Sequence, residues 1–272
     1  TKKKTKDDQG HLCSPETAAA SALIGKITDP RDIASLYAME YPQFEDPELH
    51  IINEDMLVAP AEDGSKVELK KGPNIKSLPE IEALKSDYEV PVLLKMQDNI
   101  STDEILKAGA EVLPFRSNLP EISKYSYTVI DETFYDRAME TKEKTGGHIV
   151  VAGDNYAQGS SREHAALAPK YLGQVAVIAK SYARIAWQNL VNFGILPLEF
   201  ENPDDLEKIE QGDTVEFKNL RQLVENRATI EVLIKKETGE VSIPTKHSLS
   251  DRQIRVLLKG GIINDFKEKL SA

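Results

Sequence analysis

The chain has 272 residues, of which 40% are hydrophobic and 29% charged, and its formal net charge at pH 7 is −11. Such a chain is long enough to bury a core of its own and has the composition of an ordinary globular protein. The excess of acidic residues disfavours bulk binding to nucleic acids and to anionic membranes. No apolar run approaches the roughly 20 residues that a membrane-spanning helix needs.

Cysteine usage and the first residues give an expectation for the compartment. Cys13 is the only cysteine, so the chain has no disulfide framework of its own. No basic segment followed by an apolar stretch opens the sequence, and no export signal is therefore expected. Together these features favour a cytoplasmic location. One thiol is also too few to hold an iron–sulfur cluster, which usually needs several thiolates.

The first third of the chain is predicted to contain one helix and a long irregular arm. Residues 1–10 form a polar charge run typical of a frayed terminus. Ser14-Pro15-Glu16 then combines a helix N-cap, a proline at the first helical position and an acidic first turn. This helix should continue to Ile24 and end at Gly25. Residues 26–89 alternate short apolar patches with Pro, Asp and Gly, which indicates a connecting arm with little core.

A regular alternation of strands and helices begins at Val90. Strands are predicted over 90–96, 127–130, 148–152, 175–179 and 196–200, and helices over 101–108, 160–172 and 183–193. Ser101-x-x-Glu104 and Ser160-x-x-Glu163 are capping boxes that would open two of these helices. The alternation between about 148 and 200 implies parallel strands joined by helical crossovers.

The last third changes to an antiparallel pattern. Strands are predicted over 214–217 and 228–235, followed by a hairpin turn at 237–240 and a strand over 241–243. Ser250-x-x-Gln253 forms a third capping box, with Leu249 placed to pack on Ile254, and opens the last predicted helix. The fold class expected from the whole pattern is α/β, with mixed parallel and antiparallel strands preceded by a helical segment and an irregular linker.

The segment 148–172 carries the strongest chemical signal. An apolar strand enters a loop that contains Gly159 and then a helix N-terminus, where unpaired N–H groups and the helix dipole favour an anion. Ser160 and Ser161 add hydroxyl groups, and Arg162 adds a planar fork that suits a carboxylate. The segment therefore predicts a carboxylate or phosphate receptor. The alternative is that Ser160 only caps a helix and that Arg162 is solvated.

A family resemblance rests on this segment and on three others. The stretch Gly-Ser-Ser-Arg-Glu-His-Ala-Ala-Leu-Ala-Pro-Lys-Tyr-Leu-Gly (159–173) resembles the signature of the swivelling domain of the aconitase superfamily. Residues 98–118 and 180–198 are similar to the same family, and 14–31 resembles the end of its preceding domain. The likeness is to a bacterial-type single-chain aconitase. It implies a swivelling β/β/α domain over 90–272, a linker arm over 36–89, and the end of the cluster-binding domains over 1–35.

The resemblance also implies a role for each matching residue. Ser160 would be the catalytic base that removes a proton next to a substrate carboxylate, and Asp103 would be an acidic catalytic residue. Ser161 and Arg162 would bind one substrate carboxylate, and Arg116 a second. The alternative explanation of Asp103 from its position is a first-turn carboxylate favoured by the helix dipole. A serine hydroxyl is a weak base at neutral pH, so its alkoxide character needs local stabilisation.

The resemblance further implies a cofactor and partners. In the family a 4Fe-4S cluster accepts the departing hydroxyl as a Lewis acid, and its ligands would come from the preceding domains and not from this chain. No metal ligands are expected here. The expected function is part of an aconitate hydratase of the tricarboxylic acid cycle, a lyase that interconverts citrate and isocitrate through cis-aconitate. The chain alone, without the cluster-bearing N-terminal domains, would be inactive.

Two departures from the family pattern keep alternatives open. Glu104 follows Asp103 where many members have histidine, and residues 106–114 align loosely, although Ser117-Asn118 is closer to aconitases. One alternative is the small subunit of a 3-isopropylmalate or homoaconitate dehydratase. A second is an RNA-binding module of a cluster-free aconitase, which the acidic charge disfavours.

Overall fold

A computed structural model of the chain describes residues 11–38, 45–48, 53–160 and 162–271. It divides into two compact units, residues 1–68 and 69–272, whose placement relative to one another is not determined. In the first unit, α1 (Pro15–Ile24) has the predicted cap, because the Ser14 hydroxyl accepts a hydrogen bond from the Thr17 amide at 3.2 Å. The remaining described elements of this unit are short: a 3₁₀ turn at Pro30–Asp32, α2 (Ile33–Tyr37), and 3₁₀ turns at Glu54–Met56 and Gly64–Lys66.

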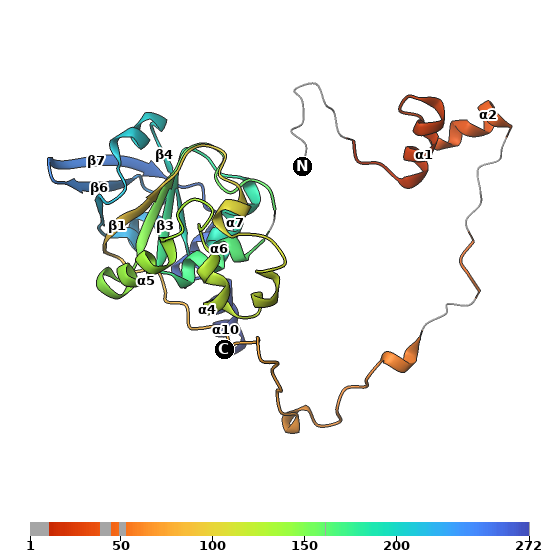
Figure 1. Cartoon of the computed structure of the whole chain (residues 1–272), viewed down its shortest axis with the longest axis horizontal. Helices are drawn as coiled ribbons and strands as arrows, with labels where there is room; N and C mark the ends of the chain where they lie inside the picture. Colours follow the sequence, from red (N-terminus) through yellow and green to blue (C-terminus); the bar gives the residue numbers. More distant parts are fainter. Residues whose placement is uncertain (1–10, 39–44, 49–52, 161, 272) are drawn as a thin grey trace. The chain divides into compact units, whose positions relative to one another are not determined.

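The second unit is a closed barrel of seven strands (Figure 1). Its strands are β1 (Tyr88–Lys95), β2 (His148–Ala152), β3 (Gln174–Ala179), β4 (Leu196–Phe200), β5 (Thr214–Phe217), β6 (Ile230–Lys236) and β7 (Gly239–Lys246). The order around the barrel is β1-β2-β3-β4-β7-β6-β5. Neighbours from β1 to β4 pair in parallel, whereas the other pairs are antiparallel. The expected α/β domain with mixed strands is confirmed.

Two apolar clusters hold this unit together. The first takes side chains from all seven strands, such as Ile149 and Val151 of β2, and therefore fills the barrel interior. The second takes the alternate residues of β1 to β3, such as Val150 and Ala152, which face outward. Because both faces of β2 and β3 are covered, these strands are continuous apolar runs and do not alternate with polar residues.

Helices cover the outer face of the parallel strands and close the barrel. The second cluster includes side chains from α3 (Thr102–Ile105), α4 (Leu119–Ile122), α5 (Phe134–Thr145), α6 (His164–Tyr171) and α7 (Arg184–Asn192). The first includes side chains from α8 (Leu220–Glu225) and α9 (Asp251–Leu258), and α10 (Ile262–Ser271) follows α9. Short 3₁₀ turns lie at Leu113–Phe115, Ser123–Tyr125 and Pro203–Lys208.

Several sequence predictions need correction. The capping boxes at Ser101 and Ser250 form as predicted. The box at Ser160 does not form, because α6 begins only at His164 with no side-chain cap. Instead, the Ser160 amide donates to the hydroxyl of Thr102 at 3.1 Å, a bond that pulls this segment away from the helix. The helix predicted over 101–108 ends at Ile105.

The strand predicted over residues 127–130 is wrong. This segment is a turn in which Tyr127 has a φ of +56°. The Tyr127 side chain is fully buried, and its hydroxyl lies 2.8 Å from that of Tyr156 and 3.0 Å from Oε1 of Gln174. The apolar character of the segment therefore reflects one buried anchor. The sequence analysis also missed α4, α5, α8 and α10, the last of which follows the helix predicted to be the final one.

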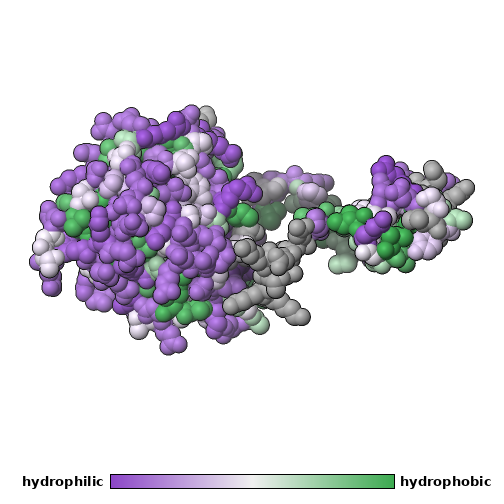
Figure 2. Space-filling model, turned by 90° about the horizontal axis from the view of Figure 1, so that it is seen from above, coloured by the Kyte–Doolittle hydropathy of each residue, from purple (hydrophilic) through white to green (hydrophobic). Residues whose placement is uncertain are grey.

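The face of the large body seen in Figure 2 is mostly hydrophilic. On the face seen in Figure 2, apolar side chains of the large body gather only in small separate groups. No helix within the described residues combines the length and apolar character required to cross a bilayer.

Candidate active site

The loops that follow β1 and β2 interlock at the carboxyl ends of the parallel strands. The Asn99 amide donates to the Asp154 carbonyl at 2.7 Å, and the Thr102 amide donates to the Gln158 carbonyl at 2.9 Å. The Asp98 carboxylate accepts from the Asp154 amide at 2.7 Å. In sheets of this kind, ligand sites form where the loops at the carboxyl ends of the strands meet.

Gly153 makes this interlock possible. A Cβ atom at this position would lie 1.8 Å from Oδ1 of Asp98, so any other residue would push the two loops apart. The loop after β3 joins them through Ser181, whose hydroxyl donates to Asp154 at 2.9 Å and accepts from the Asn155 amide at 2.8 Å. Three loops are thereby held in one fixed arrangement.

Arg162 lies against α3 within this arrangement. Its Nη1 donates to the Leu106 carbonyl at 3.0 Å, and its Nη2 lies 3.4 Å from the Thr102 hydroxyl. Nη2 also forms an ion pair with the Asp103 carboxylate. The Arg162 side chain is 17% exposed and the Asp103 side chain 69% exposed. The guanidinium is therefore fixed by the protein, whereas its carboxylate partner is largely in solvent and is exchangeable for another carboxylate.

Ser160 lies beside Arg162 on the same loop. It is exposed, and its amide is held by the Thr102 hydroxyl. It also precedes α6, in which the first helical bonds are donated by Ala165 and Ala166, so the amides ahead of them have no intrahelical partner. These amides and the helix dipole favour negative charge near Ser160. Ser161, predicted to bind a carboxylate, lies outside the described residues.

Arg116 reaches the same region through His164. The Nε2 atom of His164 lies 2.8 Å from the Arg116 carbonyl oxygen, and since a carbonyl only accepts, this nitrogen carries the proton. Arg116, Arg162 and His164 line one small hollow, together with apolar side chains such as Leu106 and Leu113. The structure thus brings the two predicted carboxylate-binding arginines to one hollow, with Asp103 and Ser160 beside Arg162.

Sequence reasoning missed the residue that connects these groups. Thr102 is buried, and its single hydroxyl contacts both the Ser160 amide and the Arg162 guanidinium. His164, which was not predicted as a site residue, contacts the Arg116 backbone. The only signal for Thr102 in the sequence is its place just after the N-cap Ser101, where a hydroxyl side chain is unremarkable.

The residues present do not fit an iron–sulfur cluster. The sequence contains a single cysteine, Cys13, and its side chain is exposed in the first unit. In the part of the chain that the structure describes, no three His, Cys, Asp or Glu side chains are grouped so that they could hold a metal ion. A cluster of four irons requires more thiolates than this chain has.

Residues 94–203 match the family model described as the aconitase C-terminal domain. The chain carries an aconitase C-terminal domain. It is 31% identical over 288 residues to the mitochondrial aconitate hydratase of Gracilaria gracilis, covering 94% of this chain and 37% of that protein. It is 36% identical over 227 residues to the mitochondrial homocitrate dehydratase of Saccharomyces cerevisiae, covering 74% of this chain and 28% of that protein.

A solved structure shows the same fold. The crystal structure of 3-isopropylmalate dehydratase from Methanocaldococcus jannaschii aligns with a TM-score of 0.52 and 29% identity, covering 68% of this chain and 96% of that one. The names of all these relatives describe the addition or removal of water, so the aconitase C-terminal domain belongs to a family of hydro-lyases.

One expectation is contradicted by these comparisons. A cytoplasmic location was expected from the single cysteine and from the start of the sequence. The similar aconitate hydratases of Gracilaria gracilis, Saccharomyces cerevisiae and Candida albicans are mitochondrial by name. The number of cysteines does not separate the two compartments, since neither requires a disulfide framework.

Proposed function

We propose that this aconitase C-terminal domain supplies one side of an aconitate hydratase active site, which interconverts citrate and isocitrate through cis-aconitate. The observation that carries the proposal is the grouping of Ser160, Arg162 and Asp103 around the Thr102 hydroxyl, where the loops after β1 and β2 interlock. This grouping lies in the segments that resemble the family signature. Substrates with several carboxylates suit a site with two arginines.

Arg162 and Arg116 bind the substrate carboxylates in this proposal. Arg162 is fixed by Leu106 and Thr102, so little rotamer entropy is lost when its fork engages a carboxylate. Asp103 occupies one arm of the fork and is exposed, so an entering carboxylate replaces a bond that already exists. The displaced Asp103 then lies next to the bound acid and is available for proton transfer.

Ser160 removes the proton from the carbon beside the substrate carboxylate. Its alkoxide form requires nearby positive charge, which the Arg162 guanidinium and the amino end of α6 supply. A positioned base of this kind contributes about 10²- to 10⁴-fold to the rate. Residues of this chain thus account for substrate binding and proton abstraction. Binding of the 4Fe-4S cluster belongs to other domains, whether they lie in the same polypeptide or in a partner subunit.

A dehydratase of the 3-isopropylmalate or homocitrate type is the second candidate, because relatives with those names match this domain. The hollow beside Arg116 is also lined by apolar Leu106, Val112 and Leu113, which suits an alkyl group. Comparing turnover of citrate, homocitrate and 3-isopropylmalate by the assembled enzyme separates these activities. A preference for 3-isopropylmalate over citrate would overturn the aconitate hydratase assignment.

The role of Ser160 is tested by Ser160→Ala in the enzyme assembled with its cluster-bearing domains. We expect kcat to fall by about 10²- to 10⁴-fold, while the visible absorption spectrum of the cluster is unchanged. Ser242→Ala is a matched control, since Ser242 lies on β7 and its hydroxyl donates to the Glu231 carboxylate. Retained turnover in Ser160→Ala excludes Ser160 as the base. The chain without the cluster-bearing domains is expected to show no turnover.

A further inference from the structure

A second cavity lies at the other end of the barrel, where β1, β2 and β3 begin. Its volume is about 230 Å³, and it is bordered by Tyr88 at the start of β1, Gly146 after α5 and Gly173 after α6. The segment Pro79–Ala83, here called the strap, forms another of its walls. Because a water molecule occupies about 30 Å³ in the liquid, this cavity has room for a small molecule of several heavy atoms. None of the residues that line this cavity also lines the hollow of the candidate active site.

Three lysines border this cavity, and two of them have no carboxylate partner. The Lys142 ammonium donates to the Tyr171 carbonyl at 2.6 Å, and the Lys170 ammonium donates to the Gly194 carbonyl at 2.7 Å. Among the described residues neither forms an ion pair. Lys85 pairs with Glu82 at 3.3 Å, but the Glu82 side chain is 80% exposed. Each ammonium has three donors. The Lys142 ammonium also lies 4.9 Å from the centre of the Tyr171 ring, so it keeps at least one donor for another partner, and Lys170 keeps two.

The charge around this cavity comes from three lysines, the two exposed glutamates Glu80 and Glu82, and three helix ends. The carboxyl ends of α5, α6 and α7 meet here, and each is equivalent to about half a negative charge. Together the helix ends offset at most about 1.5 of the two charges on Lys142 and Lys170. Glu80 and Glu82 are exposed, so solvent screens their effect on these ammonium groups. The pKa of Lys170 is lowered to about 8, mainly by burial; Glu82 opposes this shift, and the neighbouring Lys142 and Lys85 contribute to it. Burial also lowers the pKa of Lys142.

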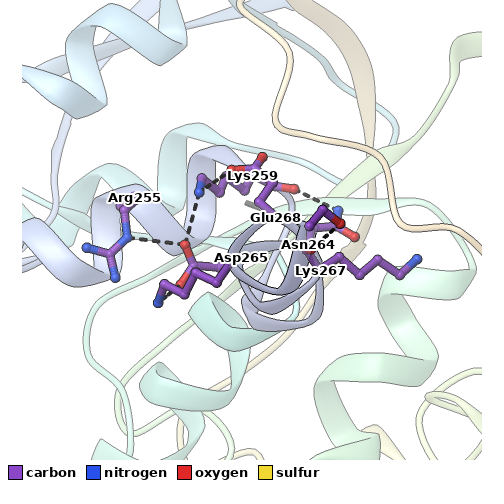
Figure 3. A network of polar contacts seen from close by, with 8 residues as sticks. Arg255, Lys259, Asn264, Asp265, Lys267 and Glu268 are labelled. Atoms are coloured by element: carbon purple, nitrogen blue, oxygen red, sulfur yellow. Dashed lines mark hydrogen bonds and ion pairs between the residues drawn. The ribbon is translucent and has the colours of Figure 1, made fainter.

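The strap is held in place by the C-terminal helices. The Asn264 side chain of α10 donates to the Ile81 carbonyl at 2.8 Å, and a Cβ atom at Gly260 would lie 2.4 Å from the Glu82 carbonyl oxygen. Figure 3 shows Arg255 and Lys259 reaching the carboxylate of the neighbouring Asp265 at 3.2 Å and 3.1 Å. Asp265 is buried, and Lys269 binds its other oxygen at 2.7 Å. This wall of the cavity is therefore set before any ligand arrives, which lowers the cost of binding.

We propose that this cavity binds a small oxyanion of two or more charges, such as inorganic phosphate or a di- or tricarboxylate, through Lys142 and Lys170. Oxygen acceptors of such an anion use the remaining ammonium donors and neutralise charge that no described carboxylate meets in an ion pair. Lys85 stands at the rim, and its ammonium has donors beyond the one that faces Glu82. The site is separate from Arg162, and the inference does not depend on the proposed hydro-lyase activity.

The test is calorimetric titration of the full 272-residue chain with inorganic phosphate and, separately, with citrate. We expect saturable binding of at least one anion, weakened about tenfold or more by Lys142→Gln, which removes one of two buried cations. Lys144→Gln is the matched control, because Lys144 lies on the same helix, is 68% exposed and already pairs with Glu140. The control should bind like the unchanged chain. The two titrations decide whether phosphate or a carboxylate is preferred.

Three results would overturn the proposal. One is the absence of saturable binding by either anion. The second is binding that Arg162→Gln abolishes and Lys142→Gln leaves intact, which would assign the anion to the candidate active site. The third concerns a substitute variant. If Lys142→Gln lowers the thermal unfolding midpoint too far for titration, Lys85→Gln replaces it, because Lys85 is 53% exposed and its removal should not disturb the fold. About a threefold loss of anion affinity is expected from this partly exposed cation, so an unchanged affinity in Lys85→Gln contradicts the proposal.

Discussion

The two ends of the barrel treat buried positive charge differently. At the carboxyl ends of the parallel strands, Arg162 is held by the carbonyl and hydroxyl groups of α3 and has its own carboxylate in Asp103. At the amino ends, Lys142 and Lys170 donate to carbonyl groups and Lys142 also contacts the Tyr171 ring, but neither forms an ion pair among the described residues. At the first end a ligand carboxylate can replace Asp103 on Arg162, whereas at the second end the ammonium groups of Lys142 and Lys170 have no carboxylate to replace. A ligand therefore has to displace a protein group at the first end but not at the second.

The largest expected effect comes from removing the cation at the carboxyl end. Arg162→Gln in the assembled enzyme should lower kcat/KM by about 100-fold or more, because a substrate carboxylate enclosed in the complex loses its charged partner, which costs about 3–5 kcal/mol. Steady-state kinetics on the preferred acid measure this loss. Phosphate binding at the amino end should not change. A variant that loses less than a few-fold in kcat/KM would show that Arg162 only braces α3.

A smaller effect is expected from the hydroxyl that organises the same end. Thr102→Val leaves the Ser160 amide without its acceptor and removes one contact of Arg162. An unsatisfied buried donor costs about 1–3 kcal/mol, which corresponds to about tenfold or more in kcat. Thr102→Ser keeps the hydroxyl and should restore turnover. If the valine variant loses stability in a denaturant titration but keeps its kcat, Thr102 supports the fold and not the position of Ser160.

The smallest expected effect is the pH dependence of anion binding in the cavity at the amino ends of the parallel strands. The pKa of Lys170 is lowered from 10.5 to about 8 by burial, and Lys142, Lys85 and Glu82 are the charged groups that act on it. The charged form is therefore lost as pH rises through about 8, and anion affinity should fall several-fold between about pH 7 and 9. Titrations at several pH values measure this. Lys144→Gln should follow the same curve, and a flat profile would remove Lys170 from the site.

The lowered pKa of Lys170 affects the stability of the fold in the opposite direction to its effect on anion affinity. The folded state binds fewer protons at Lys170 than the unfolded chain between about pH 8 and 10.5. The contribution of this lysine to stability therefore rises with pH across that window, whereas anion binding weakens. Unfolding measured with and without phosphate should show the two trends diverging.

The sequence predicted elements whose signals are local. The caps at Ser14, Ser101 and Ser250 and the buried runs of β2 and β3 lie within a few residues, and the structure has them. Closure of the barrel could not be predicted in this way. It depends on pairs such as Tyr88 with Phe217 and Phe200 with Thr245, which no local pattern connects. Only Phe134 and Ala138 of α5 are buried, which left that helix with too weak an apolar pattern to detect.

The candidate site shows the same limit. Arg162 and Ser160 were found from their motif, and Asp103 and Arg116 from the family resemblance. The misassigned cap at Ser160 has a tertiary cause, because its amide bonds to Thr102, which lies 58 positions earlier. Thr102 itself was missed for the same reason. A hydroxyl that connects two loops has no signature in either loop alone.

The closed barrel also bears on the chains in which this domain occurs. Because β1 pairs with β5 as well as β2, the sheet closes on itself, and each of its strands has a neighbour on both sides, although β4 and β7 pair only at Glu199–Lys246 and Phe200–Thr245. Closure of the sheet therefore does not depend on a strand from another domain. The same fold accounts for 96% of the Methanocaldococcus jannaschii chain, whereas this chain corresponds to 37% of the Gracilaria gracilis protein. A barrel that closes within its own sequence suits a separate chain as well as a longer one.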